Sequence, residues 1–230
     1  MRQRGRSENV RCAAFGLDWL PPASRALRGT LVSQGRPKNF VYPPQRPDQI
    51  ARMSTFSIRP YLMEDIDEVY CAVDESREHV RKWMAWLTPE YSRGEVAKWV
   101  EHAVASWERE EEYEHLIIDT VDGAIAGACG LNFLDRTNGY CNLGYWVRAS
   151  RIGQGAAHQA ALLLRDFGFG TLALNRLEIV VADGNEFSRK VAESSGAIYE
   201  GLQRLRLKVG DTAYDAHMYA LLNPSAKNIR

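Results

Sequence analysis

Residues 144–160 read GYWVRASRIGQGAAHQA, and this stretch is the most informative part of the sequence. It begins with aromatic and β-branched residues, which favour a strand, and it ends in alanine-rich sequence, which favours a helix. Gly153-Gln154-Gly155 lies between the two. Glycines let a backbone approach a ligand closely, and the free N–H groups and dipole at a helix N-terminus favour an anion. The stretch therefore predicts a strand, a loop with an anion site, and a helix.

Two familiar phosphate-binding motifs do not fit this loop. A phosphate loop of nucleotide hydrolases needs Gly-Lys-Ser/Thr, whereas the helix here continues as Ala156-Ala157-His158. A dinucleotide fingerprint needs a third glycine where His158 stands. A pyrophosphate without a magnesium ligand or a ribose-reading acid suits a coenzyme A site. The alternative is a plain strand-to-helix connection, because two glycines before a helix are a weak signal alone.

Upstream of this unit, the sequence predicts one strand and two helices. The alternating Thr55–Arg59 favours a strand, and Glu64 to about Val80 has apolar residues at helical spacing. Ser92-Arg93-Gly94-Glu95 has the form of a capping box, and the apolar residues behind it recur three or four apart as far as Trp107.

Three antiparallel strands should follow. Asp122-Gly123 is a strong hairpin signal between His115–Val121 and a strand from Ala124 to Leu134. A turn containing Asn138-Gly139 then leads into Tyr140–Val147.

Downstream, the pattern continues with a helix over Ala156–Phe169 and a short apolar strand over Arg176–Ala182, which predicts burial on both faces. A helix over Asn185–Ser195 and two strands, Ala197–Lys208 and Thr212–Leu221, complete the order. We therefore expect one α/β (α+β) domain over residues 53–222, with a mixed, mostly antiparallel sheet of six to seven strands flanked by helices.

The net charge of zero conceals a division of the chain. Residues 1–52 hold ten Arg/Lys, three Asp/Glu and six of the nine prolines, so this segment carries +7 and the remainder −7. It shows no apolar periodicity, and we expect a poorly ordered extension. It could be an upstream stretch with Met53 as the natural start, a basic arm for nucleic acid or a ribosome, or a transit peptide. Residues 223–230 form a short C-terminal tail.

Composition narrows the class of protein further. The longest apolar runs are too short for a transmembrane helix, so we expect no membrane partner. The four cysteines have neither CxxC spacing nor a histidine pattern, which favours free thiols in a cytoplasmic protein over a disulfide frame or a metal site.

From about residue 56 to 221, the chain resembles the GNAT acetyltransferase superfamily, and within it the ribosomal-protein N-terminal acetyltransferases of the RimJ/RimL type. The segments that carry the resemblance are Leu143–Val147 with Gly153–Ala157, Asn175–Ile179 followed by an N-x-x-S unit at Asn185 and Ser188, Ser195-Gly196-Ala197 with Glu200-Gly201, and the patch Arg81–Leu87.

The resemblance implies a site for acetyl-CoA as the acetyl donor and no metal. The backbone of Tyr145, Trp146 and Val147 would pair with the pantetheine arm. Asn185 would lie near that arm, and Ser188 near the thioester sulfur, where it could protonate the departing thiolate. The pyrophosphate would be held by the N–H groups of Ile152, Gly153, Gln154, Gly155, Ala156 and Ala157, and Trp83 and Trp86 would line the acceptor pocket.

Each role has a simpler alternative. Asn185 is also a plausible N-cap. Ser188 could be an ordinary exposed helix residue, and the two tryptophans could be core residues.

The sequence departs from the family pattern in two places. Ile152 stands where the family's loop usually has Gln or Arg, and the neighbouring Arg151 is the candidate substitute. Relatives often carry a glutamate on the strand after Glu200-Gly201, but Leu202–Leu207 contains no acid. The usual base candidate is therefore missing.

Other candidates for the base are weak. We expect Glu78 and the run Glu108–Glu114 to be solvated helix residues. The five histidines stand alone in the sequence and are expected at surface or core positions: His79, His102, His115, His158 and His217.

Three functions stay open: acetylation of a protein N-terminus such as that of a ribosomal protein, acetylation of a small amine such as a polyamine, amino acid or aminoglycoside, and acyl-CoA binding without catalysis. The missing acid favours an N-terminal amine, because an α-amine has a lower pKa than a lysine and needs less base. The oligomeric state also stays open, with a homodimer as one option.

Overall fold

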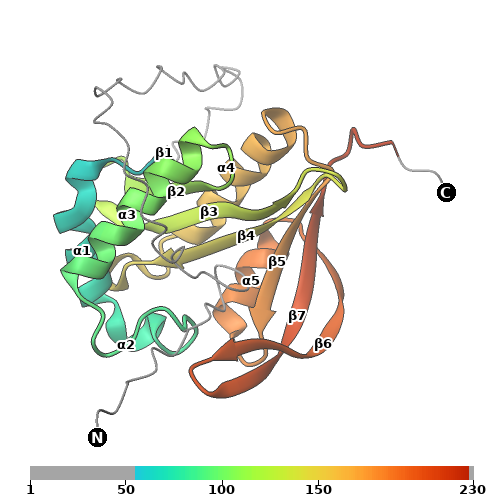
Figure 1. Ribbon diagram of the computed structural model, residues 1–230. Helices are drawn as coiled ribbons and strands as arrows, with labels where there is room; N and C mark the ends of the chain where they lie inside the picture. Colours follow the sequence, from blue (N-terminus) through green and yellow to red (C-terminus); the bar gives the residue numbers. More distant parts are fainter. Residues whose placement is uncertain (1–54, 228–230) are drawn as a thin grey trace, which may run out of the picture.

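The computed structural model describes residues 55–227, which form a seven-stranded mixed sheet with helices on both faces (Figure 1). Each neighbouring pair in the order β1-β2-β3-β4-β5-β7-β6 is antiparallel except β4–β5. The predicted class and sheet are confirmed. The elements are β1 Phe56–Pro60, η2 Met63–Asp65, α1 Ile66–Glu75, α2 Arg77–Val80, α3 Arg93–Glu108, β2 Tyr113–Asp119, β3 Ile125–Asp135, β4 Tyr140–Val147, η3 Ala149–Arg151, α4 Ala156–Gly170, β5 Arg176–Ala182, α5 Glu186–Ser194, β6 Ile198–Val209 and β7 Thr212–Leu222.

The local signals for helix starts and turns are confirmed. The Glu95 carboxylate accepts a hydrogen bond from the N–H of Ser92 at 2.8 Å, as a capping box requires at the start of α3. Gly123 and Gly139 have φ values of 77° and 70° in the turns before and after β3. Glycine adopts this conformation without steric cost, so both hairpins form where the sequence predicts them.

The prediction of one continuous helix from Glu64 to Val80 is wrong, because the chain breaks at Ser76. Ser76 has φ −102° and ψ 2°, between α1 and α2. Its buried hydroxyl donates to the carbonyl of Ala72 at 2.6 Å and accepts from the N–H of Ala149 at 3.0 Å. A serine side chain that bonds to backbone groups in this way competes with the helix. The break also ties α1 to the start of η3.

Two apolar layers hold the sheet. One cluster joins the residues of α4 to Cys141, Leu143 and Leu177 on one face of the sheet. The other joins α1 and α3 to Leu116 and Trp146 on the opposite face. Because successive side chains of a strand point to opposite faces, Leu143 and Trp146 on β4 serve different layers.

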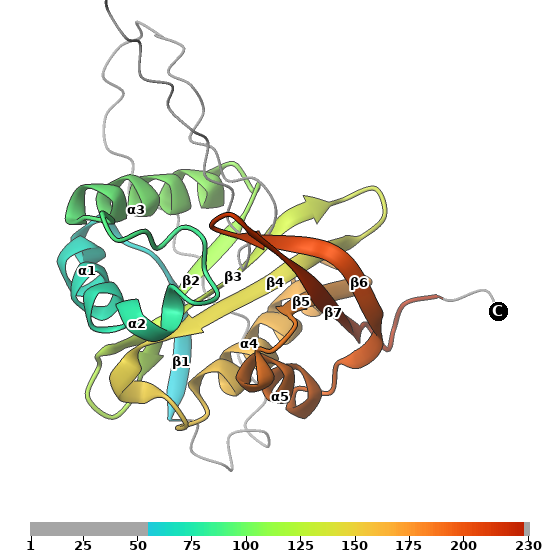
Figure 2. The same cartoon turned by 90° about the horizontal axis from the view of Figure 1, so that it is seen from below.

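The sheet splits between β4 and β5. These strands pair in parallel only at Tyr140–Arg176, Cys141–Leu177 and Asn142–Glu178. Beyond Asn142, β5 follows β7 and β6, and the three strands turn away from β4 (Figures 1 and 2). One edge of β4 is therefore left without a strand partner from Leu143 onward.

The expectation that β5 is buried on both faces is wrong. Its residues alternate between half-buried and buried from Arg176 to Val181. Leu177 and Ile179 face the α4 layer, whereas Arg176 forms ion pairs with Glu178 and Glu200 on the other side. The alternation arises because the split leaves that other side of β5 without a covering helix.

The ends of the chain are only partly described. The expected basic extension over residues 1–52 lies outside the described residues, as do residues 228–230. Asn223 follows β7 directly and donates from its side chain to the carbonyl of Leu174 at 2.9 Å. Among the described helices, none combines the length and the apolarity needed to cross a membrane.

Candidate active site in the cleft between β4 and β5

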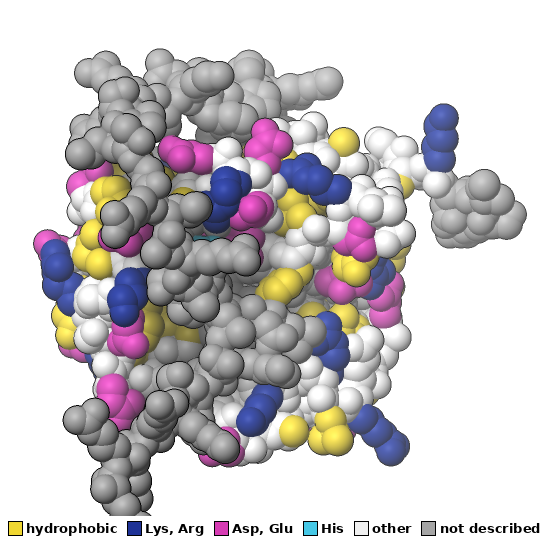
Figure 3. Space-filling view, viewed as in Figure 1, with side chains coloured by type: hydrophobic (Ala, Val, Ile, Leu, Met, Phe, Trp, Pro, Cys, Tyr) yellow, Lys and Arg dark blue, Asp and Glu magenta, His cyan; other side chains and the backbone are white. Residues whose placement is uncertain are grey.

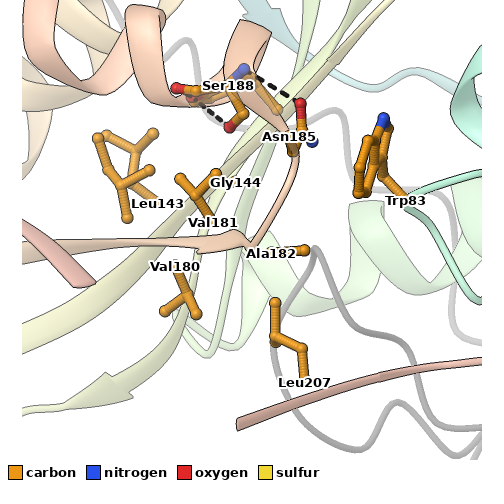
Figure 4. Close-up of a pocket in the computed structure, with 11 residues that line it drawn as sticks. Trp83, Leu143, Gly144, Val180, Val181, Ala182, Asn185, Ser188 and Leu207 are labelled. Carbon is orange, nitrogen blue, oxygen red and sulfur yellow. Dashed lines mark hydrogen bonds between the residues drawn. The ribbon is translucent and has the colours of Figure 1, made fainter. Parts of the chain in front are cut away.

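The split in the sheet opens a cleft (Figure 4). One wall comes from β4, the opposite wall from β5, and the rim from the start of α5, the segment after α2, and β6. The lining residues are Trp83, Leu143, Gly144, Tyr145, Ile179, Val180, Val181, Ala182, Asn185, Ser188 and Leu207.

The exposed edge of β4 presents backbone groups to this cleft. The N–H of Arg148 donates to the carbonyl of Ala126 on β3 at 2.8 Å. Because alternate backbone groups of a strand point to opposite neighbours, the N–H groups of Tyr145 and Val147 point away from β3, toward the cleft. The carbonyl of Val147 on the same edge accepts a hydrogen bond from Nε2 of His79 at 2.8 Å. A ligand along β4 would therefore find donors at positions 145 and 147.

The glycine loop lies beyond the end of β4. Gly153 and Gly155 have φ values of 78° and 87°, and a Cβ atom at either position would meet nothing within 4 Å. Within residues 55–227, the first N–H of α4 with a carbonyl acceptor is that of Gln159, which donates to the carbonyl of Gly155 at 2.9 Å. The N–H groups before it are available at the helix N-terminus, where the dipole favours an anion. The loop and helix start therefore fit a pyrophosphate, and the Ile152 side chain beside them is 49% exposed.

Arg151, the candidate substitute for the family's Gln or Arg, is engaged elsewhere. Its guanidinium lies 3.2 Å from the carboxylate of Asp119 and also pairs with Asp122. These acids belong to the end of β2 and the turn that follows it. Arg151 therefore fastens the start of the glycine loop to the β2–β3 turn, and its side chain is directed to carboxylates.

The N-x-x-S unit is built as a cap and lines the cleft as well. The side-chain oxygen of Asn185 accepts from the N–H of Ser188 at 3.2 Å, so the alternative interpretation of Asn185 as an N-cap is confirmed. The Tyr145 hydroxyl lies 3.0 Å from Oγ of Ser188 and 3.1 Å from its carbonyl oxygen. Burial raises the pKa of the Tyr145 phenol, which keeps it protonated. Ser188 is therefore a half-buried cleft residue with a hydroxyl partner across the gap.

The two tryptophans lie in different surroundings. Trp83 lines the cleft (Figure 4), and its ring lies 4.7 Å from Nζ of Lys82. Trp86 belongs to the α1–α3 layer, where its ring centroid is 5.2 Å from that of Tyr91 and 6.3 Å from that of Trp146. The structure brings Trp83 to the cleft and Trp86 to the core.

The histidines are not alone in the folded chain. His115 is fully buried, and burial lowers its pKa to about 4. His79 bonds to the end of β4 as described above, a role that no sequence motif indicates. Glu78 is exposed, as expected. Each of the other three histidines contacts a polar side chain: His102 lies 2.9 Å from Glu112, His158 lies 3.1 Å from Ser194, and His217 lies 2.9 Å from Asp183.

The largest departure from the sequence prediction concerns Glu114. Instead of a solvated helix end, residues from Tyr113 onward form β2, and Glu114 is 0% exposed. Burial, together with the nearby Glu112, raises its pKa to about 8. Its Oε1 accepts from the side-chain amide of Asn132 at 3.1 Å. Its Oε2 has no hydrogen-bond partner among the described residues. The sequence did not predict this burial, because Glu114 follows a run of acidic residues that is typical of a solvated surface.

Within the described residues, no group of three or more His, Cys, Asp or Glu side chains is arranged to hold a metal ion.

Comparisons with known proteins agree with this architecture. "Putative ribosomal N-acetyltransferase YdaF" of Bacillus subtilis is 38% identical over 101 residues, which are 44% of this chain and 55% of YdaF. The match thus spans about half of that relative. "Probable N-acetyltransferase YjcK" of the same organism is 27% identical over 176 residues, which cover 74% of this chain and 95% of YjcK.

Solved structures share the fold. A crystal structure titled a probable acetyltransferase is 27% identical, with a TM-score of 0.68 over 73% of this chain and 93% of that one. RimL, a ribosomal L7/L12 α-N-protein acetyltransferase solved with coenzyme A, is 21% identical, with a TM-score of 0.70 over 75% of this chain and 97% of RimL. The family model for the acetyltransferase (GNAT) domain matches residues 56–198, more than half of the chain. The chain belongs to the GNAT acetyltransferase family.

Proposed function

We propose that this protein is an acetyl-CoA-dependent N-acetyltransferase that acts on the N-terminal α-amine of a protein. The observation that carries the proposal is the separation of β4 from β5 beyond Asn142, next to a glycine loop at the start of α4. An extended arm ending in a pyrophosphate fits a cleft of this form. Family membership supports the chemistry, and the name of YdaF supports a protein acceptor.

Each part of the donor has a candidate position among the residues around the cleft. The N–H groups of Tyr145 and Val147 would bond to the amides of the pantetheine arm, as in the addition of a strand. The N–H groups from Gly153 to Ala157 would hold the pyrophosphate. When bound, acetyl-CoA supplies an activated thioester, which is delivered beside Ser188.

The reaction is a direct attack of a neutral amine on the thioester carbonyl carbon. A backbone N–H on the free edge of β4 would stabilise the negative charge that develops on the carbonyl oxygen. The hydroxyl pair of Ser188 and Tyr145 would protonate the departing thiolate. The Tyr145 phenol donates its one hydrogen to the carbonyl of Ser188 at 3.1 Å, so the hydroxyl of Ser188 is the group whose hydrogen would turn to the sulfur.

An α-amine is the favoured acceptor for two reasons. Its pKa of about 7.7–8.0 leaves roughly a tenth of the amine neutral at pH 7. A lysine, with a pKa of about 10.4, has a far smaller neutral fraction at that pH. A polyamine site would also favour a strongly acidic surface. Residues 53–230 carry a net charge of −7, which suits a cationic acceptor, but in the uncovered part of the face in Figure 3 acidic and basic side chains are interspersed and form no strongly acidic patch.

The test is to incubate the full chain with acetyl-CoA and a panel of peptides with free N-termini, polyamines, amino acids and aminoglycosides. Mass spectrometry of the products identifies the acceptor. Acetylation of a peptide α-amine, with none on polyamines, is the expected result. Acetylation of only a small amine would replace the proposed acceptor, and binding of acetyl-CoA without any product would indicate a non-catalytic module. Failure to bind acetyl-CoA at all would overturn the proposal.

A further inference from the structure

Glu114 lies on β2, and the positions in register with it on the next two strands, β3 and β4, are both glycines. Glu114 is opposite Gly130 on β3, and Gly130 is opposite Gly144 on β4. Gly144 lines the cleft. Since directly opposed residues share a face, the three positions form a row from the buried carboxyl to the cleft.

The carboxylate extends along this row. A Cβ atom at position 130 would overlap the carboxylate of Glu114, so the side chain lies over Gly130 in space that only glycine leaves free. Neighbouring strands are about 4.8 Å apart, so a group over Gly130 is about one strand spacing from Gly144. One water molecule spans that distance.

A chain of amides fixes the carboxylate. Asn132 donates to Oε1 of Glu114 at 3.1 Å, and Asn142 donates to the side-chain oxygen of Asn132 at 2.9 Å. Both asparagines lie on the same face as Gly144 by alternation along β3 and β4. The network bonds only to Oε1 of Glu114. Its Oε2 is buried and has no hydrogen-bond partner within residues 55–227. A buried carboxylate oxygen with no partner demands a ligand, because it otherwise costs free energy.

We propose that Glu114 is the general base of the acetyl transfer and accepts the proton of the acceptor amine through a water molecule held over Gly144. This inference rests on the proposed function. The amine nitrogen forms a bond to the acetyl carbon while the carbon–sulfur bond breaks and its electron pair goes to sulfur. The proton lost by nitrogen passes through the water to Oε2, and the thiolate takes a proton from the hydroxyl pair on the opposite side of the cleft. Exchange with solvent then resets both groups.

Glu114 would supply the base that is missing from Leu202–Leu207, the segment in which relatives often carry a glutamate. The base comes from β2 and reaches the cleft through positions that lack side chains. Its pKa of about 8 matches an α-amine at about 7.7–8.0, so proton transfer between them is close to balanced.

The groups around Glu114 influence the pKa of its carboxyl group. Burial raises the pKa of Glu114 most, the charge of Glu112 adds to the rise, and Asn132 opposes it by donating to the carboxylate. The Tyr61 phenol and the Cys129 thiol also interact with its charge, and burial raises the pKa of each, so both stay neutral. Glu112 is therefore the charged neighbour through which the base can be tuned.

The decisive experiment compares Glu114→Gln with wild type, using acetyl-CoA and the peptide that the full-length protein acetylates best. Glutamine keeps the size of the side chain and its acceptor for Asn132, but it cannot take a proton. We expect kcat to fall at least about 100-fold, with the affinity for coenzyme A unchanged by calorimetry. In wild type, kcat should rise with pH and level off near the pKa of Glu114, and this limb should vanish in the variant.

Glu112→Gln is the matched control. It removes a half-buried carboxylate two residues away and should keep the rate at the plateau, while the rising limb of the pH profile moves to lower pH. A purely structural role for Glu114 would not produce that movement. Near-wild-type kcat in Glu114→Gln, or a limb that stays in place in Glu112→Gln, would overturn the inference while leaving the proposed function intact. Absence of acetylation by wild type would overturn both.

Discussion

The hydroxyl oxygens of Tyr145 and Ser188 lie 3.0 Å apart, with Tyr145 on the β4 wall of the cleft and Ser188 on its rim at the start of α5. Tyr145 belongs to β4, whose free edge would bind the donor, and Ser188 belongs to α5, which follows β5. The pair therefore spans the split at the place where a thioester sulfur would lie. Its hydrogen bond positions Ser188 more firmly than the helix cap alone.

We predict that Ser188→Ala lowers kcat about 10-fold and changes acetyl-CoA affinity little. This effect is below the usual range for acid catalysis, because a thiolate of pKa near 8.5 leaves with little assistance. Tyr145→Phe should have a smaller effect on kcat, and the double variant should resemble Ser188→Ala, since both act through one hydroxyl. Steady-state kinetics of the three variants check this. Equal activity in Ser188→Ala would make Ser188 a structural residue.

We predict that Gly155→Trp abolishes acetyl-CoA binding in calorimetry. Gly155 has open space around it and φ 87°, so an indole there would occupy the anion site and strain the loop. Gly210→Trp is the matched control, because Gly210 also has positive φ and open space but lies in the β6–β7 turn. Unchanged affinity in Gly155→Trp would refute the loop as the pyrophosphate site.

We predict that Arg151→Ala lowers the free energy of unfolding by about 1–3 kcal/mol, because it leaves the buried carboxylate of Asp119 without its charged partner. Arg165→Ala, which removes an ion pair with its exposed neighbour Asp166, should cost less than about 0.5 kcal/mol. Urea denaturation monitored by fluorescence measures both. If Arg151→Ala leaves stability unchanged but removes most of the acetyl-CoA affinity, its side chain binds the donor instead of fastening the loop.

We predict that Glu114→Gln makes the protein more stable than wild type at alkaline pH. The folded pKa of Glu114 is about 8, whereas an unfolded glutamate titrates near 4.3, so the folded state holds the extra proton between these values. The stability that this proton provides is complete below about pH 4.3 and is lost as the pH rises through 8. Thermal unfolding of both proteins from pH 5 to pH 9 should show the advantage of the variant growing with pH. A constant difference would show that Glu114 is ionised throughout.

Local signals predicted most of the fold. The turns at Asp122-Gly123 and Asn138-Gly139 and the capping box at Ser92 are short-range features, and each one lies where expected. The break at Ser76 was not predictable, because its cause is a hydrogen bond to Ala149, far along the chain.

The candidate site was predictable in part. Gly153 and Gly155 before a helix indicated an anion site, and the resemblance to the family added Asn185 and Ser188, which line the cleft. The surroundings of Trp86 and Glu114 could not be predicted locally, because Trp86 packs against the α1–α3 layer and Glu114 becomes buried where β2 places it opposite Gly130. A run of acids at the end of a helix gives no sign of which one enters the sheet.

The central claim is that the donor lies along the free edge of β4, and hydrogen exchange tests it most directly. The full-length protein is compared with and without saturating acetyl-CoA, and amide exchange is followed by mass spectrometry. We expect slower exchange in two segments, residues 143–147 and 153–157, with β1 and β2 unchanged. Protection elsewhere, with exchange in both segments unaltered although acetyl-CoA is bound, would contradict it.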